Sequence, residues 1–148
     1  MAKKTSYKLE FDGFWRSEDK QDIPEGTGIY CVYEGKHFDE GEDAGSIELL
    51  TLIYVGESKN VRQRIIKHEK FREWTQHTHK GTELCFSYAP YEGKVPDRKR
   101  ISAALIYQHQ PPSNKKQLNS FPYEKTQIVL SGNIDLLTEK FDLDKVLS

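Results

Sequence analysis

The sequence predicts an α/β (α+β) domain in which strands and helices alternate, and three observations support this. Three segments are dense in β-branched and aromatic residues, as strands are: 27–34, 49–55 and 83–89. Two others have the apolar spacing of helices: 60–74 and 98–109. The chain has 148 residues, of which 36% are hydrophobic, enough for one core. We therefore expect residues 1–148 to form a single domain.

The strands are delimited by turn residues. Residues 27–34 follow the turn signal Pro24-Glu25-Gly26. A loop over 35–45, with three glycines and a run of acids, separates them from residues 49–55, so the two strands should pair in antiparallel fashion. Residues 83–89 alternate as a third strand. Two further strands are expected: an edge strand at 7–11 and a strand at 125–130.

The helices have recognisable ends. Ser58 or Asn60 can cap a helix that runs to about Trp74, with Val61 and Ile65 on its buried face. The helix at 98–109 presents Ile101, Ala104 and Leu105 on one face and should stop at Pro111-Pro112. A last helix is predicted over 134–147, with apolar residues available for packing: Leu136, Leu137, Phe141 and Val146.

Composition excludes several classes of protein. Cys31 and Cys85 lie far apart inside strand-like runs, which favours buried free thiols in a reducing compartment. The longest apolar stretch, 47–55, is too short to cross a membrane, and the first residues lack an apolar segment. We expect a cytoplasmic protein with no membrane partner. A His-x-His pair, His77 and His79, has no evident third ligand for zinc.

The charges are unevenly distributed although the net charge is −1. Residues 34–48 contain six acids and one lysine, whereas residues 59–80 contain seven bases and two acids. The second segment would present a basic surface to a polyanion, although a solvated helix face has a similar composition.

Several short motifs follow one another in order. They are Gly28-Ile29-Tyr30, Tyr54-Val55-Gly56, Arg64 with His68, Leu105-Ile106, and Pro111-Pro112-Ser113-Asn114. Together they make residues 28–114 resemble a GIY-YIG nuclease domain. The resemblance implies a small three-stranded antiparallel sheet flanked by helices. Outside it we expect an N-terminal lead-in at 1–27 and a C-terminal strand and helix extension at 115–148. It also implies a DNA endonuclease that uses a divalent metal, magnesium or manganese.

The resemblance assigns catalytic roles to four side chains. Hydrolysis of a phosphodiester needs an activated water, stabilisation of charge on the phosphate, and protonation of the leaving oxygen. Tyr30 would act as base or proton relay, and Tyr54 would orient the water or contact the phosphate. Arg64 offers a planar fork for phosphate oxygens, and His68 would relay a proton or hold the phosphate. A phenol is a poor base at neutral pH unless cations lower its pKa of ~10 or another group takes the proton.

DNA is the expected partner, and a second group of residues is expected to contact it. These are Lys59, Arg62, Lys67, Lys70, His77 and Asn114. Oligomeric state is not readable from the sequence.

One position departs from the family. Where the family has a metal-binding glutamate, three residues before the Leu-Ile pair, this chain has Ser102, a neutral and weak ligand for magnesium. Glu57 is the nearest alternative carboxylate in the sequence. Three interpretations remain: an active endonuclease with a substitute or weakened ligand, an inactive domain that binds nucleic acid, and a domain whose acidic loop and acidic C-terminal segment recruit a protein partner.

Overall fold

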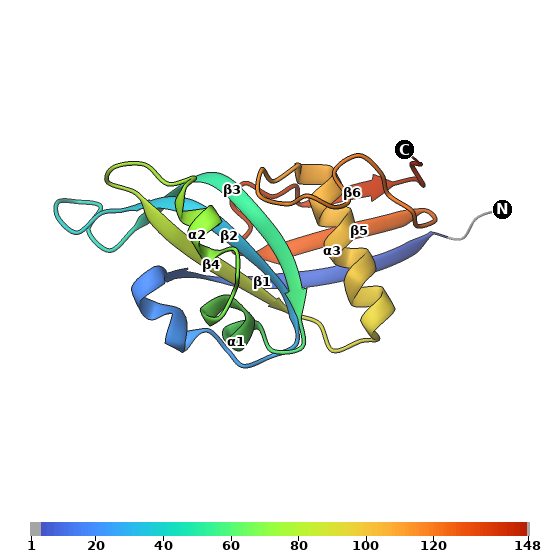
Figure 1. The fold of residues 1–148 in the computed structure, drawn as a ribbon, viewed down its shortest axis with the longest axis horizontal. Helices are drawn as coiled ribbons and strands as arrows, with labels where there is room; N and C mark the ends of the chain where they lie inside the picture. Colours follow the sequence, from blue (N-terminus) through green and yellow to red (C-terminus); the bar gives the residue numbers. More distant parts are fainter. Residues whose placement is uncertain (1–3, 148) are drawn as a thin grey trace.

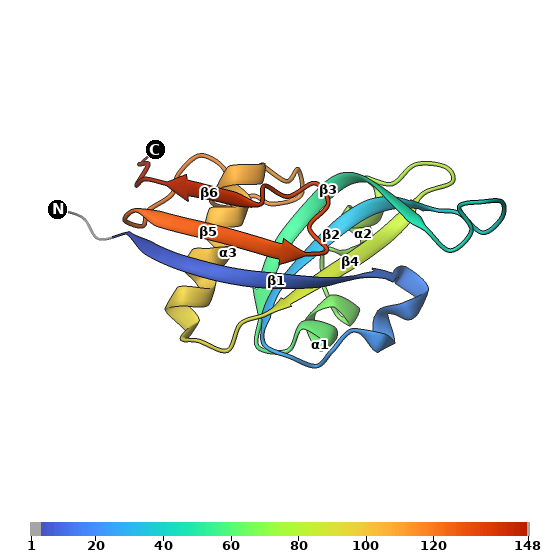
Figure 2. The same ribbon diagram turned by 180° about the vertical axis from the view of Figure 1, so that it is seen from behind.

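The computed structural model describes residues 4–147 and contains a single large sheet with helices packed against it (Figures 1 and 2). Its elements, in order, are β1 (Thr5–Arg16), the 3-10 helix η1 (Ser17–Asp22), β2 (Gly28–His37), β3 (Ile47–Ser58), α1 (Val61–Ile66), α2 (Phe71–Thr75), β4 (Glu83–Pro90), α3 (Val95–His109), β5 (Thr126–Gly132) and β6 (Lys140–Leu143).

The sheet has six strands in the order β3-β2-β4-β1-β5-β6, so the predicted small three-stranded antiparallel sheet flanked by helices is wrong. The antiparallel pairing of β2 with β3 is confirmed, but β1 pairs with β5 in parallel, which makes the sheet mixed. The predicted edge strand at 7–11 instead lies inside the sheet, between β4 and β5. Its alternate residues Tyr7, Leu9 and Phe11 are buried, and this burial holds β1 at the centre.

The predicted helix at 134–147 is also wrong. Leu136 has φ 67°, a left-handed conformation that a helix does not accommodate. Residues 140–143 form β6 instead, in which Phe141 pairs with Ile128 of β5 and is buried. The apolar spacing in this segment reflects packing on the sheet, which a local pattern does not distinguish from helical packing.

The predicted helix from residue 60 to Trp74 is divided into α1 and α2. Asn60 caps α1 as expected, since its side chain accepts a hydrogen bond from the Gln63 amide. The helix stops at Ile66 because the next residues make a turn, in which Nδ1 of His68 accepts a hydrogen bond from the Lys70 amide. The helix predicted at 98–109 is confirmed as α3, which ends at His109. Gln110, with φ 53°, caps it just before Pro111.

Two apolar clusters cover opposite faces of strand β2, which lies next to the edge strand β3. Ile29, Cys31 and Tyr33 belong to the cluster that includes α3, whereas Tyr30 and Val32 belong to the cluster that includes α1 and α2. Figure 1 shows α3 on one side of β3 and the two short helices on the other. The end of β3 therefore lies between residues from both helical groups. No helix within residues 4–147 is long and apolar enough to cross a membrane.

Candidate active site

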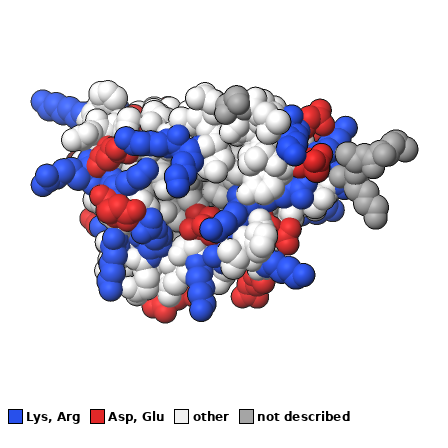
Figure 3. All heavy atoms as spheres, turned by 45° about the vertical axis from the view of Figure 1, so that its right-hand side comes forward, with Lys and Arg blue, Asp and Glu red and all other residues white. Residues whose placement is uncertain are grey.

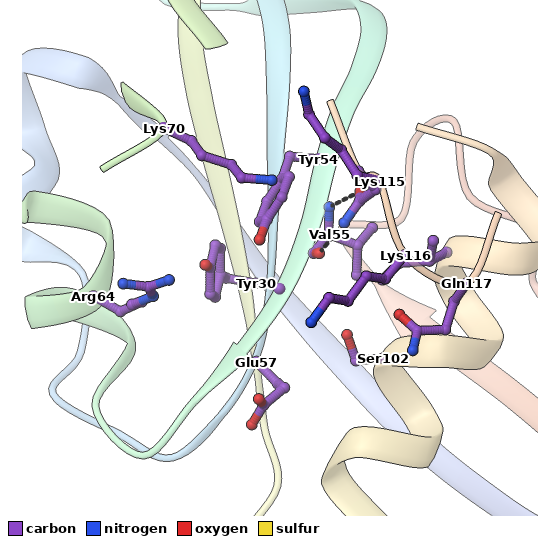
Figure 4. A pocket seen from close by; sticks show the side chains of 13 residues that line it. Tyr30, Tyr54, Val55, Glu57, Arg64, Lys70, Ser102, Lys115, Lys116 and Gln117 are labelled. Carbon is purple, nitrogen blue, oxygen red and sulfur yellow. Dashed lines mark hydrogen bonds between the residues drawn. The ribbon is translucent and has the colours of Figure 1, made fainter. Parts of the chain in front are cut away.

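A hollow of about 470 Å³ lies at the end of β3 and is lined by at least one residue from each of the motifs (Figure 4). Its lining residues are Tyr30, Tyr54, Val55, Gly56, Glu57, Arg64, Lys70, Ser102, Ile106, Asn114, Lys115, Lys116 and Gln117. The strands supply the tyrosines, α1 supplies Arg64, and α3 supplies Ser102. Segments distant in sequence therefore meet at one surface.

The two motif tyrosines lie side by side on neighbouring strands. Tyr30 on β2 is 1% exposed, and Tyr54 on β3 is half-buried, with 6.2 Å between their ring centroids. Tyr30 pairs in register with Gly56, and a Cβ at Gly56 would overlap the Tyr30 ring. The glycine of the second motif is thus required for the position of the tyrosine of the first.

Both phenols stay protonated at neutral pH. Burial raises the pKa of Tyr30 well above its ordinary value, and the Arg64 guanidinium only partly opposes the rise. Burial likewise raises the pKa of Tyr54, with Arg64 again opposing it. Tyr30 is therefore not a phenolate at neutral pH, and this argues against its expected role as a base. A neutral hydroxyl can still orient a water or donate a hydrogen bond.

Arg64 is close to the tyrosines but is held by a carboxylate. Its Nη1 and Nη2 donate to the two oxygens of Glu69 over 2.8 and 3.0 Å. This charge-assisted pair lowers the pKa of Glu69 to about 2 and raises that of Arg64. The Arg64 side chain remains 39% exposed, so its guanidinium is accessible at the rim of the hollow.

His68 is buried in an aromatic cluster. Its ring lies 4.3 Å from that of Trp74 and 5.4 Å from that of Tyr54, measured between centroids. Burial lowers its pKa to about 4, so the ring is neutral, and the nearby Glu69 carboxylate at 3.8 Å makes no ion pair with it at neutral pH. Because Nδ1 accepts from the Lys70 amide, we assign the proton to Nε2, which has no partner within residues 4–147. His68 does not line the hollow.

The residues at the expected metal position do not form a suitable ligand set. Ser102 is buried on α3 and offers one neutral hydroxyl. Glu57 is neutralised by Arg98, whose Nε donates to Oε1 over 2.6 Å. No group of three or more His, Cys, Asp or Glu side chains in the described part of the chain is placed to hold a metal ion. Magnesium prefers carboxylates and waters, so this donor chemistry does not fit it.

Asn114 closes the edge of β3. Its Oδ1 accepts from the Val55 amide over 2.9 Å and its Nδ2 donates to the Val55 carbonyl over 3.0 Å. The Ser113 amide also donates to the Ile53 carbonyl. Both ends of the buried Asn114 amide are thus used within the protein, which gives it a structural task different from the expected contact with nucleic acid.

Sequence reasoning missed Lys115 and Lys116. Both line the hollow, and Figure 4 shows the end of Lys116 directed into the space near Tyr30, Glu57 and Ser102. Their signal was their position immediately after Pro-x-x-Asn, since Asn114 fixes the chain to β3. Lys70, which was expected to contact nucleic acid, also lines the hollow, with its Nζ 5.2 Å from the centre of the Tyr54 ring.

The other expected DNA contacts lie outside the hollow. These are Lys59, Arg62, Lys67 and His77. Lys59 and Lys67 are exposed, whereas Arg62 pairs with Glu25 at 2.8 Å. On the face drawn in Figure 3, basic and acidic side chains are interspersed. The basic segment is therefore partly compensated by nearby carboxylates.

Comparison with protein-family models, with curated proteins and with solved structures found no match for this chain.

Proposed function

We propose that this protein is an endonuclease of the GIY-YIG type that hydrolyses phosphodiester bonds in DNA. The observation that carries the proposal is the convergence of the motif side chains on one hollow. Tyr30, Tyr54 and Arg64, which are distant in sequence, line the same surface together with three lysines, Lys70, Lys115 and Lys116. Hydroxyl groups beside an excess of cations suit a phosphodiester, which carries negative charge and reacts with water.

The chemistry needs a proton acceptor, and the lining residues offer one. When the water oxygen forms its bond to phosphorus, one bond from phosphorus to an ester oxygen breaks, the water loses a proton, and the leaving oxygen gains one. Glu57 is the only carboxylate among the described residues that line the hollow. Arg98 engages its Oε1, and Oε2 has no hydrogen-bond partner within residues 4–147. We assign to Glu57 the proton of the attacking water.

The remaining residues bind and orient the phosphate in this proposal. Tyr30 and Tyr54, which burial keeps protonated, donate hydrogen bonds to the water or to a non-bridging phosphate oxygen. Arg64 contributes a fixed positive charge at the rim while Glu69 holds its guanidinium. The ring of His68 packs edge-to-face against the ring of Tyr54. The role of His68 is thus to position Tyr54 and not to transfer a proton.

A plasmid assay tests the proposal. The purified protein is incubated with supercoiled plasmid in magnesium, in manganese and in EDTA, and the open circular product is measured. We expect nicking in at least one condition and a decrease of about 10²-fold in Tyr30→Phe, the order of magnitude of one positioned catalytic group. Nicking that Tyr30→Phe leaves unchanged, or that occurs in none of the three conditions, contradicts the proposal.

A second candidate is a DNA-binding domain without turnover. The ion pair between Glu57 and Arg98 favours it, because it engages the one carboxylate that lines the hollow together with Ser102 among the described residues. For this candidate, affinity for a short DNA duplex is measured by fluorescence anisotropy over a range of salt. Contacts between the lysines and phosphates release counterions, so affinity should decrease steeply with salt in a protein that does not nick. Binding that is absent, or independent of salt, excludes it.

A further inference from the structure

We propose that Lys116 takes the place of a divalent cation in this site, where its ammonium group stabilises the phosphate charge and gives the leaving oxygen its proton. The inference rests on the proposed function and adds to it a second reacting group and independence from metal. The donor chemistry beside Ser102 does not suit magnesium, so another group has to supply the positive charge in that space.

Lys116 reaches that space from an anchored part of the chain. Two residues earlier, the Asn114 amide makes two hydrogen bonds with Val55 of β3. The Lys116 side chain then lines both the main hollow and an adjoining one of about 280 Å³, which also contains Glu57 and Ser102. In Figure 4 its nitrogen lies in the space between Tyr30, Glu57 and Ser102. A flexible side chain on a fixed backbone can follow a phosphate through the reaction.

The local charges favour an ammonium group over a metal ion. Glu57 is the one carboxylate available in the hollow among the described residues, and it already forms an ion pair with Arg98. Lys116 makes no ion pair within the described residues, so no carboxylate there holds its ammonium group. A divalent cation beside Lys116 would be repelled by the positive ammonium group, and the described lining residues offer no pair of carboxylates to offset this repulsion. An anionic phosphate compensates the same charge.

Lys115 does not have the same surroundings. Its side chain is 73% exposed and its Nζ lies 3.6 Å from Glu73. Glu73 in turn accepts a hydrogen bond from the Ser113 hydroxyl. Lys115 is therefore directed toward a carboxylate that does not line the hollow, and we expect it to contribute to DNA affinity. Lys116 is the lysine positioned for the reacting phosphate.

The step balances without a metal. A water oxygen attacks phosphorus while its proton passes to Glu57, and the bond from phosphorus to the leaving oxygen breaks. The leaving oxygen takes a proton from the Lys116 ammonium, which becomes a neutral amine. The cycle closes when Glu57 releases its proton to solvent and Lys116 regains one.

Plasmid nicking in EDTA tests the inference. Wild-type protein should nick equally well in EDTA and in magnesium. Lys116→Ala should decrease the rate about 10²- to 10⁴-fold, the usual contribution of general acid catalysis, and change DNA affinity less than tenfold. Lys116→Arg keeps the charge but gives up its proton poorly, so it should retain binding and remain slow. The control Lys140→Ala removes one exposed charge from β6 and should nick like wild type.

The outcomes separate this inference from the proposed function. Nicking that requires magnesium, or that Lys116→Ala leaves unchanged, overturns the inference while the nuclease assignment stands. Absence of nicking in every condition overturns both. In the double variant Lys116→Ala with Ser102→Glu, a carboxylate replaces the serine and the lysine charge is removed. We expect this variant to regain nicking only with magnesium or manganese, and a variant equally active in EDTA contradicts the exchange of lysine for metal.

Discussion

Gly56 and Tyr30 lie opposite each other on β3 and β2, and the tyrosine ring occupies the space that a side chain at residue 56 would need. The same ring lies at the wall of the hollow and 6.2 Å from that of Tyr54. A glycine in one motif therefore determines where a hydroxyl from the other motif points. This relationship links the two tripeptides physically, through packing of a ring against bare backbone.

Gly56→Ala should displace the Tyr30 ring. The added Cβ overlaps ring atoms that lie in a packed cluster, so we expect a loss of about 1–3 kcal/mol in unfolding free energy, as for other overpacked sites. Nicking should decrease as in Tyr30→Phe. The control is Gly45→Ala, at φ 88° in an open loop, which should cost stability through backbone strain without loss of nicking. Equal nicking by Gly56→Ala and wild type would contradict the expected displacement.

Asn114→Ala should release the segment that carries the lysines. It removes two buried hydrogen bonds and leaves the Val55 amide and carbonyl unpaired at the sheet edge, at a cost of roughly 2–4 kcal/mol. We expect a lower urea midpoint and slower nicking. Asn119→Ala, at an exposed position in the same segment, is the matched control and should leave both unchanged.

Glu69→Gln should free the Arg64 guanidinium for phosphate. The carboxylate holds both Nη atoms of Arg64, and an amide cannot accept the same pair of charged hydrogen bonds. Affinity for a short duplex should increase and its salt dependence should steepen by about one phosphate contact. Glu92→Gln removes an exposed acid outside the hollow and controls for net charge. If both variants gain affinity equally, the bidentate pair is not what restrains Arg64.

Glu57→Gln should separate proton transfer from binding. The amide can still accept the hydrogen bond from Arg98 but cannot take a proton from water, so nicking should decrease about 10²- to 10⁴-fold. DNA affinity should be equal to or higher than that of wild type because a negative charge is lost from the hollow. Thermal unfolding is measured alongside, since the Arg98 guanidinium is mostly buried and loses its partner charge. Nicking within twofold of wild type excludes Glu57 as the proton acceptor.

Stability should decrease on mild acidification because of His68. Burial holds its native pKa at about 4, below the ordinary value of 6.5, so the unfolded state binds the proton first as pH falls. The free energy of unfolding should therefore decrease between about pH 6.5 and 4, by roughly 3 kcal/mol at most. Burial also lowers the pKa of His109, which acts in the same direction.

Urea unfolding at pH 7 and pH 5 measures this effect, above the range in which Glu69 titrates. His68→Gln and His109→Gln are compared with wild type. The free energy of unfolding should depend less on pH in His68→Gln than in wild type. If the full dependence is retained, His68 is not the group that causes it.

Much of the local structure was predictable because it depends on neighbouring residues. The strands β2, β3, β4 and β5, the Asn60 cap and the helix α3 follow from alternation, capping and the prolines after Gln110. The helix at 60–74 was predicted too long, because the hydrogen bond from the Lys70 amide to His68 competes with helical bonding. The apolar spacing at 134–147 predicts a helix, but it arises from packing on the sheet beside the partner strand β5.

The sequence by itself identified three residues of the candidate site, since Tyr30, Tyr54 and Arg64 are named by their motifs and line one hollow. It also named His68, which does not line that hollow, and gave no place to Lys116, which does. Only the tertiary structure decided the six-stranded order of the sheet, the neutral state of His68, the pairing of Glu57 with Arg98 and the approach of Lys116. The physical reason is the separation along the chain over which each interaction acts. Motifs and capping act over a few residues, whereas strand order, desolvation and ion pairing depend on which distant segments meet, and burial then sets the charge of each side chain.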